Sequence, residues 1–153
     1  MPDDRWELEY CYGYRSADSR NNVHYNANGN AVYITACLGV VLDQGNNTQK
    51  FFGAKPAETS HKSRANDMDQ HTNDIMCIAI SADGRRALTG QVNNAPVMFL
   101  WDACTGEKIQ RFKLPAGSKG VIACSISADG DCVGCVDDSN EHKVHVYGAD
   151  GSL

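Results

Sequence analysis

The stretch NDIMCIAISADGRRALTG, residues 73 to 90, consists of two short apolar runs joined by a turn at Asp83-Gly84. Nearly the same pattern returns as VIACSISADGDCVG at residues 121 to 134, where Asp129 follows Asp83 by 46 residues. A supersecondary unit that recurs at such a period is the signature of a repeat architecture, and this spacing lies close to that of propeller blades.

A weaker third copy, VHYNANGNAVYITA, occupies residues 23 to 36. Asp-Gly and Asn-Gly are strong hairpin signals, because both central residues of a type I′ turn need positive φ and these residues tolerate it best. The sequence therefore predicts three hairpins, with turns at Asn28-Gly29, Asp83-Gly84 and Asp129-Gly130.

The middle copy continues with two further predicted strands, around Val97 to Trp101 and Lys108 to Lys113, which makes four antiparallel strands. The runs IMCIAI and VIACSI are apolar on both faces, so we expect both sides of these strands to be covered. The last strand, KIQRFK, is more polar and suits an outer position. The prediction is an all-β fold, a partial β-propeller of about three four-stranded blades with the last incomplete.

The same pattern divides the chain. The expected units are an N-terminal segment at 1–22, a first blade at 23–53, a polar loop insertion at 54–70, a second blade at 71–115 and a truncated third blade at 116–153.

Composition excludes several functional classes. The chain has 14 basic and 19 acidic residues, a formal net charge of −5, and no concentrated basic stretch, which disfavours nucleic acid as a partner. Neither a secretory signal nor an apolar run of membrane-spanning length is present, so we expect no membrane partner and a cytoplasmic location. Seven cysteines, mostly within apolar runs, are expected to be free thiols in a reducing compartment.

The middle repeat resembles a WD-repeat blade, because a histidine precedes its first strand and LWD closes its third. In that family a histidine, a strand hydroxyl, a turn aspartate and a tryptophan form a structural hydrogen-bond network. The resemblance assigns the histidine, hydroxyl and tryptophan here and leaves Asn93 or Asn94 in the place of the aspartate. Tyr147 replaces tryptophan in the last repeat. The residues carried over, with the aspartate that completes the WD pair, are His71, Thr89, Trp101 and Asp102.

The N-terminal third, beginning YCYGYRSADSRNNVHY at residue 10, resembles the HELP motif and first blade of the echinoderm microtubule-associated protein-like family. The matching residues are Tyr12, Gly13, Tyr14, Arg15, Asp18, Arg20, Asn21 and Asn22. The resemblance implies a cytoskeletal scaffold that contacts tubulin or microtubules through a larger propeller. A generic WD-repeat adaptor, which binds other proteins through its propeller face, is the alternative.

The residues of this segment suggest two local features by themselves. Hydrophobic residues alternate with others from Trp6 to Tyr14, which predicts an extended ribbon with its aromatic face packed on a core. Arg15, Asp18 and Arg20 are compatible with an anion site, but salt bridges that stabilise a local turn are the favoured interpretation.

The sequence contains few patterns typical of metal-binding, redox or catalytic sites. CVGC at 132–135 has the spacing of a metal or redox pair, yet residues three apart on a strand point to opposite faces. HKVH at 142–145 has the same problem. Phosphate-binding loops and a nucleophile elbow are absent from the sequence. We therefore predict no catalytic, cofactor or metal residues and no enzyme activity.

The number of repeats raises a further expectation. Propellers close with four to eight blades, whereas about three are predicted here, so the chain reads as an N-terminal fragment of a longer protein. Uncovered sheet faces at the ends of such a fragment favour self-association. Because tubulin is itself acidic, electrostatic steering would not favour its binding to this chain.

Overall fold

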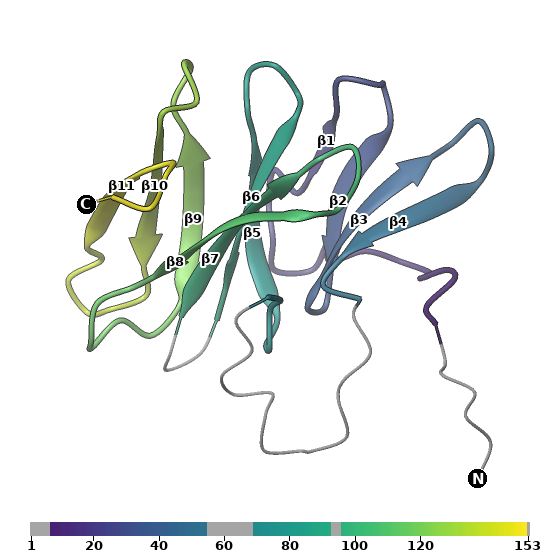
Figure 1. Cartoon of the computed structure of the whole chain (residues 1–153). Coiled ribbons are helices and arrows are strands. Elements are labelled where there is room, and N and C mark those ends of the chain that lie inside the picture. The colour runs from purple at the N-terminus through teal and green to yellow at the C-terminus, as the bar shows by residue number, and fades with distance from the viewer. Residues whose placement is uncertain (1–6, 55–68, 93–95, 153) are drawn as a thin grey trace, which may run out of the picture.

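The computed structural model describes residues 7–54, 69–92 and 96–152. It contains three antiparallel sheets placed side by side (Figure 1). The first holds β1 (Val23–Tyr25), β2 (Ala31–Thr35), β3 (Leu38–Asp43) and β4 (Thr48–Phe52); the second holds β5 (Ile75–Ile80), β6 (Arg86–Gln91), β7 (Val97–Asp102) and β8 (Lys108–Lys113); and the third holds β9 (Val121–Ile126), β10 (Cys132–Asp137) and β11 (Val144–Gly148). The all-β fold with an incomplete third unit is confirmed.

The first two strands of the second and third sheets follow the 46-residue repeat without a shift. β9 and β10 begin and end 46 residues after β5 and β6. In each sheet neighbouring strands along the chain are also neighbours in space, so each unit is a simple meander. The outer strand β8 is largely exposed, as its polar sequence predicts.

The second sheet separates two hydrophobic cores, because its side chains alternate between its two faces. Phe99 and Trp101 of β7 belong to the core shared with the first sheet, whereas Met98 and Leu100 belong to the core shared with the third. This alternation explains why VMFLW is apolar throughout. Gly39 of β3 is required at this interface, since a Cβ there would lie 2.6 Å from the Trp101 ring.

The third sheet is covered on one face only. Its β9 packs against β5 and β6, while Ile122, Val144 and Val146 on the other side are exposed. The expectation that VIACSI is covered on both faces does not hold within the described chain. The apolar side chains of that second face are available to a further surface.

The hairpins form where predicted, but the turn type differs. Positive φ occurs at Gly29, Gly84 and Gly130 and not at the residues that precede them. The type I′ prediction is therefore wrong. In the middle turn the Asp83 carboxylate instead accepts hydrogen bonds from the Arg85 N–H at 3.0 Å and the Ser81 hydroxyl at 2.6 Å. An aspartate that ties down its own turn needs no positive φ itself.

Candidate functional site

The N-terminal ribbon runs along the first sheet and is held there by polar contacts. The Gln49 side chain of β4 accepts a hydrogen bond from the Cys11 N–H at 2.7 Å and donates one to the Cys11 carbonyl at 3.0 Å. A single amide thereby satisfies both main-chain groups of Cys11, as a neighbouring strand would. Further along, the Arg15 N–H donates to the Ile34 carbonyl at 3.0 Å.

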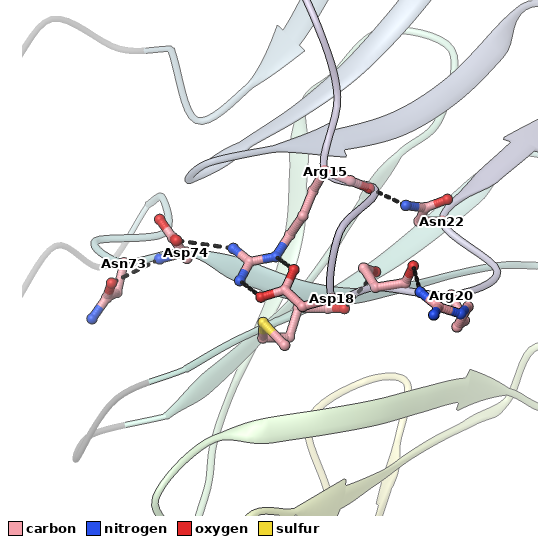
Figure 2. A network of polar contacts seen from close by, with 8 residues as sticks. Arg15, Asp18, Arg20, Asn22, Asn73 and Asp74 are labelled. Atoms are coloured by element: carbon pink, nitrogen blue, oxygen red, sulfur yellow. Dashed lines mark hydrogen bonds and ion pairs between the residues drawn. The ribbon is translucent and has the colours of Figure 1, made fainter.

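Arg15 connects the ribbon to the second sheet (Figure 2). Its guanidinium donates to both carboxylate oxygens of Asp18, at 2.8 and 2.7 Å, and to Asp74 at 2.9 Å. The hydrogen bond from Arg15 holds the pKa of Asp18 below its usual range. Asp74 immediately precedes β5. The Arg15 guanidinium, which binds both carboxylates, therefore joins the ribbon to a segment 59 residues further along the chain.

The residues of the motif that follow Asp18 make further hydrogen bonds, which hold the turn between Arg15 and Asn22 in place. The Ser19 hydroxyl donates to the Met76 carbonyl of β5 at 2.9 Å, and Arg20 donates to the Ser19 carbonyl at 3.2 Å. The Asn22 amide donates to the Arg15 carbonyl, and Asn21 has a φ of +52°. The arginines of this segment are therefore engaged by carboxylates and carbonyls of the protein, which matches the salt-bridge interpretation of this turn.

The aromatic side chains of the ribbon do not pack as predicted. Tyr12 is 88% exposed and Tyr14 is 53% exposed, although the Tyr14 ring meets Tyr33 edge-on with centroids 6.4 Å apart. The prediction of a buried aromatic face is wrong for these residues, and Trp6 lies outside the described residues. Gly13, with a φ of +87°, interrupts the two-residue alternation on which the prediction relied.

A buried hydrogen-bond network links the segment before β5 to β6 and β7. His71 Nε2 lies 2.8 Å from the Thr89 hydroxyl, which also accepts a hydrogen bond from the Trp101 indole N–H at 3.2 Å. The structure thus brings together the three residues that the WD-type resemblance selected. Asp102 lies apart from them, and its carboxylate accepts hydrogen bonds from the N–H groups of Cys104 and Thr105, both at 2.8 Å.

Gln91 closes this network. Its side-chain oxygen accepts from the Thr72 N–H at 3.1 Å and lies 2.9 Å from His71 Nδ1. Because a backbone N–H can only donate, this oxygen is fixed as an acceptor, and Nδ1 must carry the proton. In the neutral ring, Nε2 then accepts a hydrogen bond from the Thr89 hydroxyl. Burial lowers the pKa of His71 to about 4, against the opposing effect of the Gln91 hydrogen bond.

Sequence reasoning missed Gln91. It placed Asn93 or Asn94 at this point, and both lie outside the described residues. The repeat held the signal, because 46 residues after Gln91 stands Asp137, the acidic residue that a WD-type pattern would lead one to expect.

Asp137 is the centre of a different network in the third sheet. Its carboxylate is 1% exposed, accepts from the Ser118 hydroxyl at 2.8 Å and the Ser139 hydroxyl at 2.5 Å, and lies 2.9 Å from His145 Nε2. The Lys143 N–H donates to it as well, at 3.0 Å. Burial opposes ionisation, yet these hydrogen bonds outweigh it and lower the pKa of Asp137.

The repeated hairpin turns also connect neighbouring sheets. The Ala27 N–H in the first turn donates to the Gly84 carbonyl at 2.9 Å, and Arg86, which follows the second turn, donates to the Gly130 carbonyl at 2.9 Å. Each turn therefore binds the next one along the chain. In both contacts the acceptor is the carbonyl of the glycine in a SADG motif, so this turn is also the point at which successive copies meet.

The described residues show no arrangement suited to a metal ion, since no group of three or more His, Cys, Asp or Glu side chains is placed to hold one. In the CVGC stretch Cys132 is exposed whereas Cys135 is buried. Within these same ranges no helix is long and apolar enough to cross a membrane.

Comparisons with known proteins identify close sequence relatives. Residues 1–40 match the family model of the HELP motif. The chain is 45% identical over 97% of its length to the ciliary WD repeat-containing protein ctxp80 of Euplotoides octocarinatus, and covers 21% of that protein. It is 33% identical over 95% of its length to human echinoderm microtubule-associated protein-like 3, of which it covers 16%. It therefore spans about a fifth or less of these relatives.

Solved structures support the fold. The WD40 repeats of RRP9 match with a TM-score of 0.64 at 15% identity, over 90% of this chain and 38% of that one. The β-propeller domain of Cps50 (Swd1) from Myceliophteria thermophila matches with a TM-score of 0.61 at 12% identity, over 95% and 40%. At these identities the likeness establishes a propeller architecture and nothing about partners.

Proposed function

Because this chain carries a HELP motif followed by WD-type repeats and is a relative of the echinoderm microtubule-associated protein-like proteins, we propose that it is part of a non-enzymatic scaffold that associates with tubulin or microtubules. The observation that carries this proposal is similarity over nearly the whole chain to such proteins. A cytoplasmic, cytoskeletal location follows from the same proposal, and a relative named as ciliary supports it.

The geometry supports a rigid role for the HELP-like segment. Gln49 and Arg15 join the ribbon to the first and second sheets, so the motif and the sheets form one body. A scaffold needs this property, because a partner contact is stronger when its residues are held in place before binding. We propose that His71, Thr89, Gln91 and Trp101 serve the same end by fixing the second unit internally.

The strand bounds also support the proposed division of the chain. β1–β4 lie within 23–53, β5–β8 within 71–115 and β9–β11 within 116–153, with the segment 54–70 between the first two sheets. We propose these as the structural units, preceded by the HELP motif segment at 1–22.

The net charge of −5 determines which kind of contact can bind tubulin. Two acidic proteins repel each other at long range, so affinity must come from shape-specific contacts. Binding that rests on such contacts does not weaken steeply when salt is raised from about 50 to about 200 mM, because screening removes repulsion as well as attraction.

The decisive experiment is sedimentation velocity of the purified chain, alone and mixed with soluble tubulin, at both salt concentrations. A faster boundary that contains both proteins is the expected result and places a tubulin contact within these residues. If no shift occurs, and the chain also fails to co-pellet with microtubules, the proposal is wrong for this part of the protein. The second candidate, an adaptor for proteins other than tubulin, is favoured by the acidic charge and would then take its place.

The same run of the chain alone tests self-association. Val144 and Val146 on the third sheet are exposed at one end of the molecule, and Val23 and Tyr25 on the first sheet are exposed at the other. We propose that isolated copies associate head to tail through these two faces, because each face can cover the other. A single monomeric boundary at high protein concentration would count against it.

A further inference from the structure

Two clefts flank the N-terminal ribbon, and the proposed scaffold function assigns neither. The first, of about 680 Å³, lies between Glu7 and Leu8 of the ribbon, the end of β4 and the turn from β7 to β8 at Thr105–Lys108. The second, of about 720 Å³, lies between ribbon residues 8–12 and the start of β4. Leu8 lines both clefts, and we call the two together the ribbon clefts.

The walls of the ribbon clefts are acidic. The first cleft is lined by Glu7, Asp69 and Glu107, and the second adds Glu9. The described lining contains one basic side chain, Lys108, which is paired with Asp69. Beyond this pair, the described lining still carries the carboxylates of Glu7, Glu9 and Glu107, which attract cationic groups.

Aromatic rings stand beside these carboxylates. Tyr12 is 88% exposed and packs against Tyr10, with ring centroids 4.8 Å apart. The Tyr10 hydroxyl donates to Asn47 at 3.0 Å, which ties this pair to the turn before β4. An exposed tyrosine held by its neighbours offers a fixed face to a guanidinium or ammonium group, and carboxylates nearby strengthen that contact.

The ribbon main chain supplies a third element of recognition. The N–H and C=O groups of residues 7–9 make no hydrogen bond within the described chain, whereas those of Cys11 are both satisfied by Gln49. Extended backbone with unpaired groups, held at one end, is a template to which another extended chain can pair.

We propose that the ribbon clefts bind an extended, arginine- or lysine-containing segment of another protein. One basic side chain lies over Tyr12 beside Glu9 in the second cleft, another lies beside Glu107 in the first, and the main chain of the segment pairs with residues 7–9. The negative charge of the walls disfavours an acidic segment. This proposal does not depend on the tubulin contact proposed above.

Fluorescence anisotropy of the full chain tests the proposal, with a labelled twelve-residue peptide of alternating arginine and alanine as the probe. A peptide with glutamate in place of each arginine is the control ligand. We expect the cationic peptide to bind and the anionic one not to. Tyr12→Ser weakens binding about 3-fold, the scale of one exposed cation–π contact. The double variant Glu9→Gln/Glu107→Gln weakens it by a further factor of about 3 through the loss of two exposed charge pairs.

Matched variants separate the ribbon clefts from net charge and general stickiness. Asp131→Asn removes an exposed carboxylate from the turn before β10, and Ile109→Ser removes an exposed apolar side chain from β8. Both should bind the peptide as the unchanged chain does. The proposal is overturned if the peptide does not bind, if the anionic peptide binds equally, or if these controls lose as much affinity as the cleft variants. All substituted side chains are exposed, and thermal melts confirm that each variant is folded before its binding is compared.

Discussion

The second and third sheets place different chemistry at equivalent positions, 46 residues apart. In the second, Gln91 holds a neutral His71 through its amide oxygen. In the third, Asp137 takes the place of Gln91, and its ionised carboxylate forms hydrogen bonds with Ser118 and His145. Both side chains lie at the end of the second strand of their sheet and are buried.

Gln91 and Asp137 share the same structural role although only Asp137 is charged: each accepts hydrogen bonds from main-chain N–H groups of a loop. Gln91 accepts from the main-chain N–H of Thr72, and Asp137 accepts from those of Ser139 and Lys143. In both sheets a buried oxygen at a strand end satisfies loop N–H groups that would otherwise be unpaired. The two solutions differ in their response to acid, which makes the comparison open to experiment.

The largest expected effect is at Trp101, where the second sheet depends on a residue that the third lacks. Trp101 is fully buried, stacks on Phe52 at 5.4 Å and donates to Thr89. Trp101→Ala should lower the free energy of unfolding by about 4 kcal/mol, measured by urea denaturation, because it leaves a large cavity between two sheets.

Tyr147 is the equivalent residue of the third sheet and provides the control. Tyr147→Phe keeps the packing against Phe112 and removes only the hydrogen bond to the Lys113 carbonyl, 3.3 Å long. We expect a loss of about 1 kcal/mol. Equal losses for the two variants would mean that the buried tryptophan is not what distinguishes the second sheet.

The next effect is a pH dependence specific to the second sheet. Unfolded chains protonate histidine near pH 6.5, whereas folded His71 resists protonation until about pH 4. The contribution of neutral His71 to the free energy of unfolding is therefore fully present above pH 6.5. It is lost as the pH drops towards 4, by about 3 kcal/mol over that range. Urea denaturation at several pH values measures this slope, and His71→Asn should flatten it.

Asp137 places the acid response of the third sheet at lower pH. Its folded pKa is lowered, so its contribution is present above the ordinary pKa of an aspartate and disappears as the pH falls through the lowered value. A variant lacking His71 should still lose stability below pH 4. If the His71→Asn variant has the same slope between pH 6.5 and 4 as the unchanged chain, another group is responsible.

The sequence allowed much of this comparison to be predicted. The 46-residue repeat and the two-residue alternation of apolar side chains were sufficient to predict the sheets and the strand β8. The contacts among His71, Thr89 and Trp101 were expected only because the middle repeat resembles a WD-repeat blade. The sheets and β8 depend on local patterns, in which side-chain direction follows from strand geometry.

The remainder depends on contacts between distant segments. Nothing local in the sequence shows that Arg15 meets Asp74, or that Gln49 pairs with the main chain of Cys11. The exposure of Tyr12 was missed because an alternating pattern shows which residues share a face, but not which face is buried. The role of Gln91 required the two repeats to be aligned.

An exchange of chemistry between the sheets gives a smaller effect. Gln91→Glu puts a carboxylate beside His71, so the pKa of His71 should rise and the loss of stability between pH 6.5 and 4 should shrink. At neutral pH we expect the variant to be destabilised by about 2 kcal/mol, because a buried charge must be desolvated before it is paired. An unchanged pH slope in urea denaturation would show that the acceptor at residue 91 does not control His71.

The smallest effect concerns the link between the HELP motif and the sheets. Arg15→Lys keeps the charge but cannot form the fork to Asp18 and Asp74, whose carboxylates are about half exposed. The global loss should be about 1 kcal/mol or less, since exposed ion pairs contribute little. Hydrogen exchange should nevertheless quicken at the Arg15 N–H, which bonds to Ile34.

Arg20→Lys is the matched control, because the one hydrogen bond that Arg20 donates among the described residues goes to the adjacent Ser19 carbonyl. It should leave exchange at residue 15 unchanged. Faster exchange at Arg15 together with unaltered exchange in β5–β8 would mean that the ribbon opens independently of the second sheet. Loss of protection in both regions would mean that the Arg15 contact to Asp74 makes the HELP motif and the second sheet one cooperative unit, and that the motif stabilises the repeat unit it precedes.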